Sequence, residues 1–123
     1  MNLTFVDAGE KTMELDGATI RYVEALQMDR SACYAAAMRS DAGQATYDPG
    51  EFARALFARC VRGWEGITLN GEEWTPTSTL RVRERTYKGA EVFVLFDEIA
   101  GPLLKAILGG EQKPEEASDD ANP

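Results

Sequence analysis

The sequence of 123 residues contains no histidine. Histidine is the commonest general base near neutral pH and a frequent metal ligand, so its absence excludes the usual nucleophile–base triads and every site with imidazole ligands. The two cysteines, Cys33 and Cys60, lack the close spacing of structural zinc ligands. No glycine-rich segment leads into the Gly-Lys-Ser/Thr of a phosphate loop. We therefore expect a protein that is not an enzyme and that holds no metal or other cofactor.

Carboxylates are the remaining candidates for acid–base chemistry. They occur as two adjacent pairs, Glu72-Glu73 and Asp97-Glu98. Adjacent residues point in different directions on a helix or a strand, so neither pair forms a ready catalytic dyad. A solvated surface explains both pairs without any function.

Long apolar runs are also missing. The longest one after residue 90, Val92–Phe96, is far shorter than the roughly 20 residues that a membrane-spanning helix needs. The first residues, MNLTFVDAGEK, have neither a basic nor an apolar signal region, so we expect no secretory signal. Without export to an oxidising compartment, the two cysteines are expected to be buried thiols rather than a disulfide.

Basic residues are outnumbered. The chain has 21 acidic and 13 basic residues and a formal net charge of −8. It therefore lacks the basic footprint of a general nucleic-acid binder. The last segment, residues 111–123, has five acids against one base and no apolar periodicity. We expect residues 1–110 to form a single globular domain and residues 111–123 to be a disordered acidic tail.

The stretch from Asp48 to Trp74 carries the clearest structural signals. Asp48 can cap a helix that opens with Pro49, and Glu51 stands three places later, where it can complete a capping box. Apolar residues then recur every four places, and Gly63 is expected to end the helix. The predicted structural core comprises Phe52, Leu56, Cys60 and Trp64.

Two dipeptides predict tight turns. Asp16-Gly17 lies between alternating segments at 13–15 and 18–23, and Asn70-Gly71 lies between residues 67–69 and 72–74. Both dipeptides favour two-residue hairpin turns. An alanine-rich segment predicts a helix that Asp29 or Ser31 caps and that ends at residues 41–43, with a short polar loop after it. Residues 3–6 are expected to form a short opening strand.

Residues 78–96 are open to two interpretations. In residues 78–88, a strand would alternate apolar residues with arginines, whereas a helix would align Arg81, Arg85 and Lys88 on one stripe. A capping Thr75 followed by Pro76 favours the helix. Residues 91–96 either begin a long apolar helix or form a strand before a short one.

The last apolar stretch, residues 92–108, has mostly helical spacing. Gly101-Pro102 lies in its middle and predicts a kink or a break. The predicted fold class is therefore α+β: an N-terminal β-hairpin followed by a small bundle of three to four helices, with a disordered acidic C-terminal tail.

Two features are suited to binding another protein. A basic cluster on an acidic chain can dock an acidic partner, although a solvated face balanced by Glu84 and Glu91 is the simpler explanation. Apolar residues of the last stretch either pack into the core or form a groove for a partner helix. The predicted partner-binding residues are Arg81, Arg85, Lys88, Leu95, Ile99, Leu103 and Ile107.

The segment Gly63-Trp64-Glu65-Gly66-Ile67, followed by Asn70-Gly71-Glu72 and Trp74-Thr75-Pro76, resembles the phage tail assembly chaperones. Small members of that group run a helix into a Trp-x-Gly-Val/Ile corner, followed by a glycine turn and an aromatic-Thr-Pro helix start. The hairpin at Asp16-Gly17, the next helix and a charged, disordered end also fit, so the resemblance covers about residues 13–110. Trp74 stands where phenylalanine is more usual, and Gly101-Pro102 has no counterpart.

The resemblance implies a non-enzymatic assembly factor of a long-tailed phage or prophage. Such proteins bind the long helical tape measure protein, keep it soluble and help tail-tube subunits to gather around it. They act in the host bacterial cytoplasm and are absent from the mature virion, and many also exist in a longer, frameshifted form. The implied partners are the tape measure protein and, as a second candidate, the tail tube protein, with no nucleic acid and no membrane. The oligomeric state is left open.

Two other functions stay open at this point. One is an acidic inhibitor that mimics DNA and blocks a host protein, although half of the net charge lies in the tail. The other is a minor structural protein of the phage tail or connector.

Overall fold

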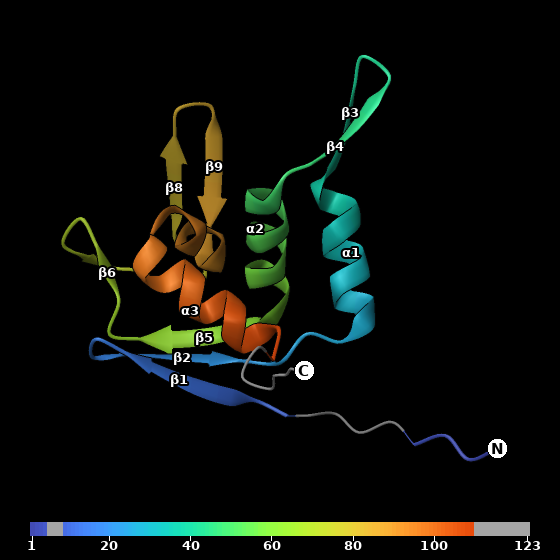
Figure 1. The fold of residues 1–123 in the computed structure, drawn as a ribbon. Helices are drawn as coiled ribbons and strands as arrows, with labels where there is room; N and C mark the ends of the chain where they lie inside the picture. Colours follow the sequence, from blue (N-terminus) through green and yellow to red (C-terminus); the bar gives the residue numbers. More distant parts are fainter. Residues whose placement is uncertain (5–8, 110–123) are drawn as a thin grey trace, which may run out of the picture.

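The computed structural model describes residues 1–4 and 9–109 as an α+β fold (Figure 1). A three-stranded antiparallel sheet lies at its base, in the order β1 (Lys11–Leu15), β2 (Ala18–Tyr22) and β5 (Val61–Glu65). Three helices stand on one side of this sheet: α1 (Gln27–Ala37), α2 (Pro49–Cys60) and α3 (Asp97–Ile107). A 3₁₀ helix, η1 (Gly89–Leu95), packs against both α2 and α3.

Three separate antiparallel hairpins complete the described part of the chain. They are β3 (Met38–Asp41) with β4 (Gln44–Tyr47), β6 (Thr68–Leu69) with β7 (Glu72–Glu73), and β8 (Thr79–Val82) with β9 (Arg85–Lys88). Figure 1 shows β3–β4 and β8–β9 projecting away from the sheet, past the end at which α2 begins. The helices predicted after the N-terminal hairpin are therefore interleaved with further hairpins and do not form a simple bundle.

The core lies between the sheet and the helices. Its largest fully buried side chains include Phe57, Phe93, Ile20, Leu56, Leu103 and Ile107. Of the four predicted core residues, Leu56 and Cys60 are completely buried and Trp64 is 8% exposed, whereas Phe52 is only half-buried. The Trp64 ring packs edge-on against Phe93, with ring centroids 4.9 Å apart. This contact joins β5 to η1.

Both predicted hairpin turns are confirmed. Asp16 and Gly17 have φ angles of 49° and 82°, and Asn70 and Gly71 have φ angles of 54° and 84°. Two successive positive φ angles match the right-handed twist of the flanking strands, which is why these dipeptides are favoured there.

The start of α2 is also confirmed. Asp48 Oδ1 accepts hydrogen bonds from the backbone N–H groups of Gly50 and Glu51, at 3.0 and 3.3 Å. The Glu51 side chain, however, does not return to the cap as predicted. It turns into a buried cluster of arginines, described below, because charged partners outcompete a single backbone N–H.

The predicted end of α2 is wrong. The helix ends at Cys60, and Gly63 and Trp64 lie in β5, where they pair with Arg21 and Ile20 of β2. Pairing with β2 satisfies backbone groups that a longer helix would have used internally. A Cβ at Gly63 would lie 2.3 Å from the Arg21 guanidinium, so a larger residue there would require the Arg21 side chain to shift.

The helix predicted to reach residues 41–43 is shorter than expected. α1 begins before Asp29, whose carboxylate accepts a hydrogen bond from the Leu26 backbone N–H at 2.8 Å. It ends at Ala37, and the predicted polar loop is the β3–β4 hairpin. Ala42 and Gly43 form its turn with φ angles of 53° and 81°. The strong helix propensity of the alanines before residue 38 favoured the longer helix.

The helical interpretation of residues 78–88 is wrong as well, because this segment forms the β8–β9 hairpin. Thr75 and Pro76 enter a turn, and Ser78 accepts a backbone hydrogen bond from Gly89 at 2.9 Å, which closes the hairpin. The last apolar stretch breaks at Phe96, between η1 and α3, and α3 continues through Pro102. The break therefore lies at the extended backbone of Phe96 and not at the proline, where it was predicted.

Two predictions lie wholly or partly outside the described residues. Leu3 and Thr4 belong to no strand, and the rest of the predicted opening strand is not described. The predicted acidic tail, residues 111–123, is also outside the described part of the chain.

Candidate functional site

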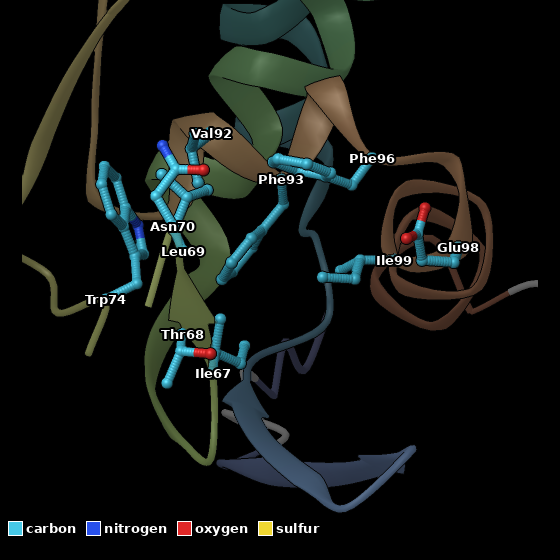
Figure 2. A pocket seen from close by; sticks show the side chains of 10 residues that line it. All are labelled: Ile67, Thr68, Leu69, Asn70, Trp74, Val92, Phe93, Phe96, Glu98 and Ile99. Atoms are coloured by element: carbon cyan, nitrogen blue, oxygen red, sulfur yellow. The ribbon is translucent and has the colours of Figure 1, made fainter. Parts of the chain in front are cut away.

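An apolar hollow of about 250 Å³ lies between the β6–β7 hairpin, η1 and the start of α3. Figure 2 shows Phe93 near its centre, with Trp74 and Leu69 on one side and Phe96 and Ile99 on the other. Phe93 and Trp74 are buried and form the floor, whereas the other three are half-buried and leave apolar surface facing the hollow. Polar rim groups come from Thr68, Asn70 and Glu98.

Local hydrogen bonds hold the walls of this hollow. The Trp74 backbone N–H donates to the carbonyl of Ile67 at 2.9 Å, which closes the β6–β7 hairpin. The Trp74 indole N–H donates to the carbonyl of Gly89 at 2.8 Å, which ties the end of that hairpin to the start of η1. A buried tryptophan usually finds such a partner for its N–H. The hairpin is thereby fixed against η1, and the hollow is preformed.

A second hollow of about 230 Å³ continues the first towards the N-terminal hairpin. The two share Ile67, Thr68, Glu98 and Ile99. The second hollow is also lined by Leu15, Ala18 and Ile20. We call the two together the α3 groove.

The α3 groove is suited to apolar side chains of another polypeptide. Each hollow is smaller than the ~300–1,000 Å³ of typical small-molecule sites and is about the size of one or two bulky side chains. Its only carboxylates, Asp16 and Glu98, are exposed. Two neighbouring apolar hollows match the anchors that an amphipathic helix places on one face.

The structure distributes the predicted apolar partner-binding residues over three places. Ile99 lines the α3 groove. Leu95 is 40% exposed but lies beside the β8–β9 hairpin, outside this groove. Leu103 and Ile107 are completely buried, because the apolar face of α3 packs onto the core. These four residues therefore do not line one groove. Of the four, Ile99 alone lines the α3 groove.

The predicted basic stripe is also divided. In the β8–β9 register, Arg81 pairs with Thr86 and Lys88 with Thr79, and all four are exposed on one face. Arg85 pairs with Val82 and lies on the opposite face, where it is half-buried. A two-residue turn between the strands produces this division, so the four-residue spacing of Arg81 and Arg85 does not place them together.

Glu51 is the residue that the sequence reasoning missed. Its carboxylate is buried and accepts hydrogen bonds from Arg54 at 3.0 Å and from Arg85 at 2.6 Å. Arg39 approaches the same oxygen at 3.8 Å, and Arg54 continues to Glu91 at 3.1 Å. Burial acts to raise the pKa of Glu51, but the hydrogen bonds from Arg54 and Arg85 outweigh it and hold this pKa below its ordinary value. One carboxylate thus joins α2 to both projecting hairpins.

Part of this cluster was visible in the sequence. Glu51 and Arg54 are three places apart, a spacing that brings side chains together on a helix. Nothing in the sequence showed that Arg85, 34 residues away, would reach the same carboxylate.

The two cysteines are free and buried, as predicted. Burial raises the pKa of Cys60 to about 11 and also raises the pKa of Cys33. Nearby, Asp29 accepts a hydrogen bond from Arg59 at 2.6 Å, which holds α1 against α2. Burial acts to raise the pKa of Asp29, but its bonds to the Leu26 N–H and to Arg59 lower it. Thiols with raised pKa values are poor nucleophiles, so this pair is structural.

Within residues 1–4 and 9–109, no three Cys, Asp or Glu side chains gather in a way that could hold a metal ion. In the same residues, no helix has the length and hydropathy needed to cross a membrane. Comparisons of this chain with known protein families, with characterised proteins and with solved structures gave no match. The functional conclusion therefore depends on the sequence resemblance and on the surfaces described above.

Proposed function

We propose that this chain is a tail assembly chaperone of a long-tailed phage or prophage. In this proposal it binds the tape measure protein in the α3 groove, keeps it soluble and promotes assembly of the tail tube. The observation that carries the proposal is the groove itself, in which half-buried Leu69, Phe96 and Ile99 line one hollow of side-chain size and Ile99 also lines the adjoining one. An amphipathic helix that would otherwise aggregate is the ligand that such a surface accommodates.

The sequence resemblance supports the proposal at some positions and not at others. The hairpins at Asp16-Gly17 and Asn70-Gly71 have the geometry that the resemblance implies. The helix corner expected at Gly63-Trp64 is a strand, and no helix starts at Thr75-Pro76. The α3 groove therefore has more weight in this proposal than the short motifs.

The proposed role includes its place in the cell. The protein acts in the host bacterial cytoplasm, catalyses no reaction and leaves before the virion is complete. Release requires binding that is weak enough to reverse, and hollows of this size supply only a few apolar anchors.

Co-expression with the tape measure protein of the same phage or prophage tests the proposal. We expect the chaperone to raise the soluble yield of that protein and to co-purify with it. Thr68→Asp places a charge in both hollows at an exposed position, so it should abolish the effect without unfolding the domain. Met28→Asp is the matched control, because Met28 is 63% exposed on α1 and lies outside the groove.

Two results would reject the proposal. One is an unchanged soluble yield with no co-purification. The other is equal rescue by wild type and Thr68→Asp, which would remove the groove from the explanation. Mass spectrometry of purified particles tests the alternative of a minor tail or connector protein. Such a protein would be found in the virion, whereas a chaperone would be absent from it.

A further inference from the structure

A third hollow lies between the turn end of the β8–β9 hairpin, Arg39 of β3 and Leu95 of η1. Figure 1 shows both hairpins projecting past the end of α2 that is opposite the sheet. The hollow is open, encloses about 590 Å³ and shares no residue with the α3 groove. Its lining combines three cations, one carboxylate and apolar side chains: Arg39 from β3, Arg83, Glu84 and Arg85 from the β8–β9 hairpin, and Val82, Tyr87 and Leu95. We call it the hairpin cleft.

The charges of the hairpin cleft are only partly paired. Glu51 faces Arg39, Arg54 and Arg85, and Arg54 is shared with Glu91. Arg39 stays 52% exposed and lies 3.6 Å from Asp48, at the limit of an ion pair.

Arg83 is the least constrained cation of the cleft. It lies in the turn of the β8–β9 hairpin with a φ of 59°, and no described residue pairs with it. Arg81 is exposed on the face of the same hairpin opposite Arg85 and does not line the cleft. Glu84 also lines the cleft and forms no ion pair with Arg83. Arg83 thus presents an unpaired positive charge in the cleft of a chain whose net charge is −8.

An apolar surface accompanies the charge. Leu95 is 40% exposed, and it is the exposed large apolar residue of η1. Tyr87 is half-buried, with the Arg85 guanidinium carbon 5.9 Å from its ring centroid. The Glu51 cluster fixes Arg85, and through it the hairpin, so the apolar side chains are held in place. Preformed surfaces bind with a smaller loss of conformational entropy.

We propose that the hairpin cleft binds an acidic polypeptide segment that carries a large apolar side chain. Carboxylates of the segment pair with Arg39 and Arg83, and its apolar side chain packs against Leu95 and Tyr87. Nucleic acid fits this surface less well. The acidic body of the protein would repel a long polyanion, and an exposed leucine cannot pair with phosphates. The chain's own segment 111–123 supplies acids but no large apolar residue.

This inference does not depend on the proposed function. The α3 groove selects apolar faces, whereas the hairpin cleft selects acid and apolar groups together. Variants in one surface leave the other intact, so the two proposals fail separately.

The test is a fluorescence anisotropy titration of the full chain with a labelled synthetic peptide built from Leu-Glu-Glu repeats. We expect saturable binding that weakens as the salt concentration rises. Arg83→Glu and Leu95→Ser should each weaken binding by about tenfold or more, as removal of an interface anchor typically does. Lys105→Glu makes the same charge change on the exposed side of α3 and should leave binding unchanged. Circular dichroism of each variant shows whether it is folded.

Three further probes decide between occupants. A peptide with serine in place of leucine, a peptide of residues 111–123 and a short DNA duplex should each bind at least about tenfold more weakly. Equal binding of the DNA or of the serine peptide would overturn the proposal in favour of a general polyanion site. Equal binding of the 111–123 peptide would assign the cleft to the chain's own end. An affinity of Arg83→Glu equal to that of wild type would also overturn the proposal.

Discussion

The indole N–H of Trp64 donates a hydrogen bond to the backbone carbonyl of Trp74 at 2.6 Å. The Trp74 indole N–H in turn donates to the carbonyl of Gly89 at 2.8 Å. Both indoles are buried, so each satisfies a polar group that would otherwise be costly to desolvate. This relay links the central sheet to the hairpins and to η1. It therefore positions the floor of the α3 groove.

Two substitutions of Trp64 should separate the stability contributed by its indole hydrogen bond from that contributed by its ring packing. Trp64→Phe retains ring packing against Phe93 but leaves the Trp74 carbonyl without its donor, and we expect a loss of about 1–3 kcal/mol in unfolding free energy. Trp64→Ala removes the packing as well, at about 3–5 kcal/mol. Urea denaturation followed by circular dichroism measures both. Unchanged unfolding of Trp64→Ala would show that the residue lies outside the core.

Gly89→Ala should destabilise the fold more than Gly71→Ala. Both glycines have positive φ angles, 57° and 84°, so alanine at either position pays a backbone strain of about 1–2 kcal/mol. At Gly89, a Cβ would also lie 2.6 Å from the Pro76 carbonyl oxygen, whereas nothing lies within 4 Å of a Cβ at Gly71. Thermal denaturation of the two variants compares them directly. Equal losses would mean that the Gly89 backbone can move away from Pro76.

Glu51→Gln should lower the free energy of unfolding at neutral pH, and its difference from wild type should disappear in acid. The folded-state pKa of Glu51 lies below its ordinary value of 4.5, so the carboxylate stabilises the fold fully above that pH. The stabilisation is lost as the pH falls through the lower, folded-state pKa. We expect a difference of about 1–3 kcal/mol from wild type at pH 7, because hydrogen bonds to charged groups are lost.

Urea titrations from pH 7 to pH 3 check the Glu51 prediction, and the difference should narrow below about pH 4.5. Glu73→Gln is the control, since Glu73 is exposed on β7 and should change stability by less than about 0.5 kcal/mol. A difference that is constant across the whole pH range would contradict the assignment of Glu51 as the buried charged partner.

Both thiols should resist alkylation in the native protein. With a pKa of about 11, only about one Cys60 side chain in a thousand is a thiolate at pH 8, and the group is also buried. Cys33 is similarly buried, and its pKa is also raised. Mass spectrometry after iodoacetamide treatment should find the native chain unmodified and the urea-unfolded chain modified twice. Rapid labelling of the native chain would show that α1 separates readily from α2.

What the sequence determined by itself is local. The turns at Asp16-Gly17 and Asn70-Gly71 and the Asp48 cap followed by Pro49 are where they were predicted. Each depends on chemistry within about four residues: a preference for positive φ, a capping oxygen, or a missing N–H at the first helical position. The burial of Leu56 and Cys60 follows for the same reason, since the helix that presents them is defined locally.

Only the tertiary structure decided where helices give way to strands and which faces are covered. α2 stops at Cys60 because β2, some 40 residues earlier, offers its edge to β5. Arg85 leaves the predicted stripe because a turn reverses the chain and a buried carboxylate on α2 pairs with it. Over a stretch of four residues, the apolar spacings of a helix and of a strand can look alike, so the sequence does not distinguish them. Contacts between distant segments determine which of the two forms. The α3 groove and the hairpin cleft are products of those distant contacts, which is why neither was predicted as a whole.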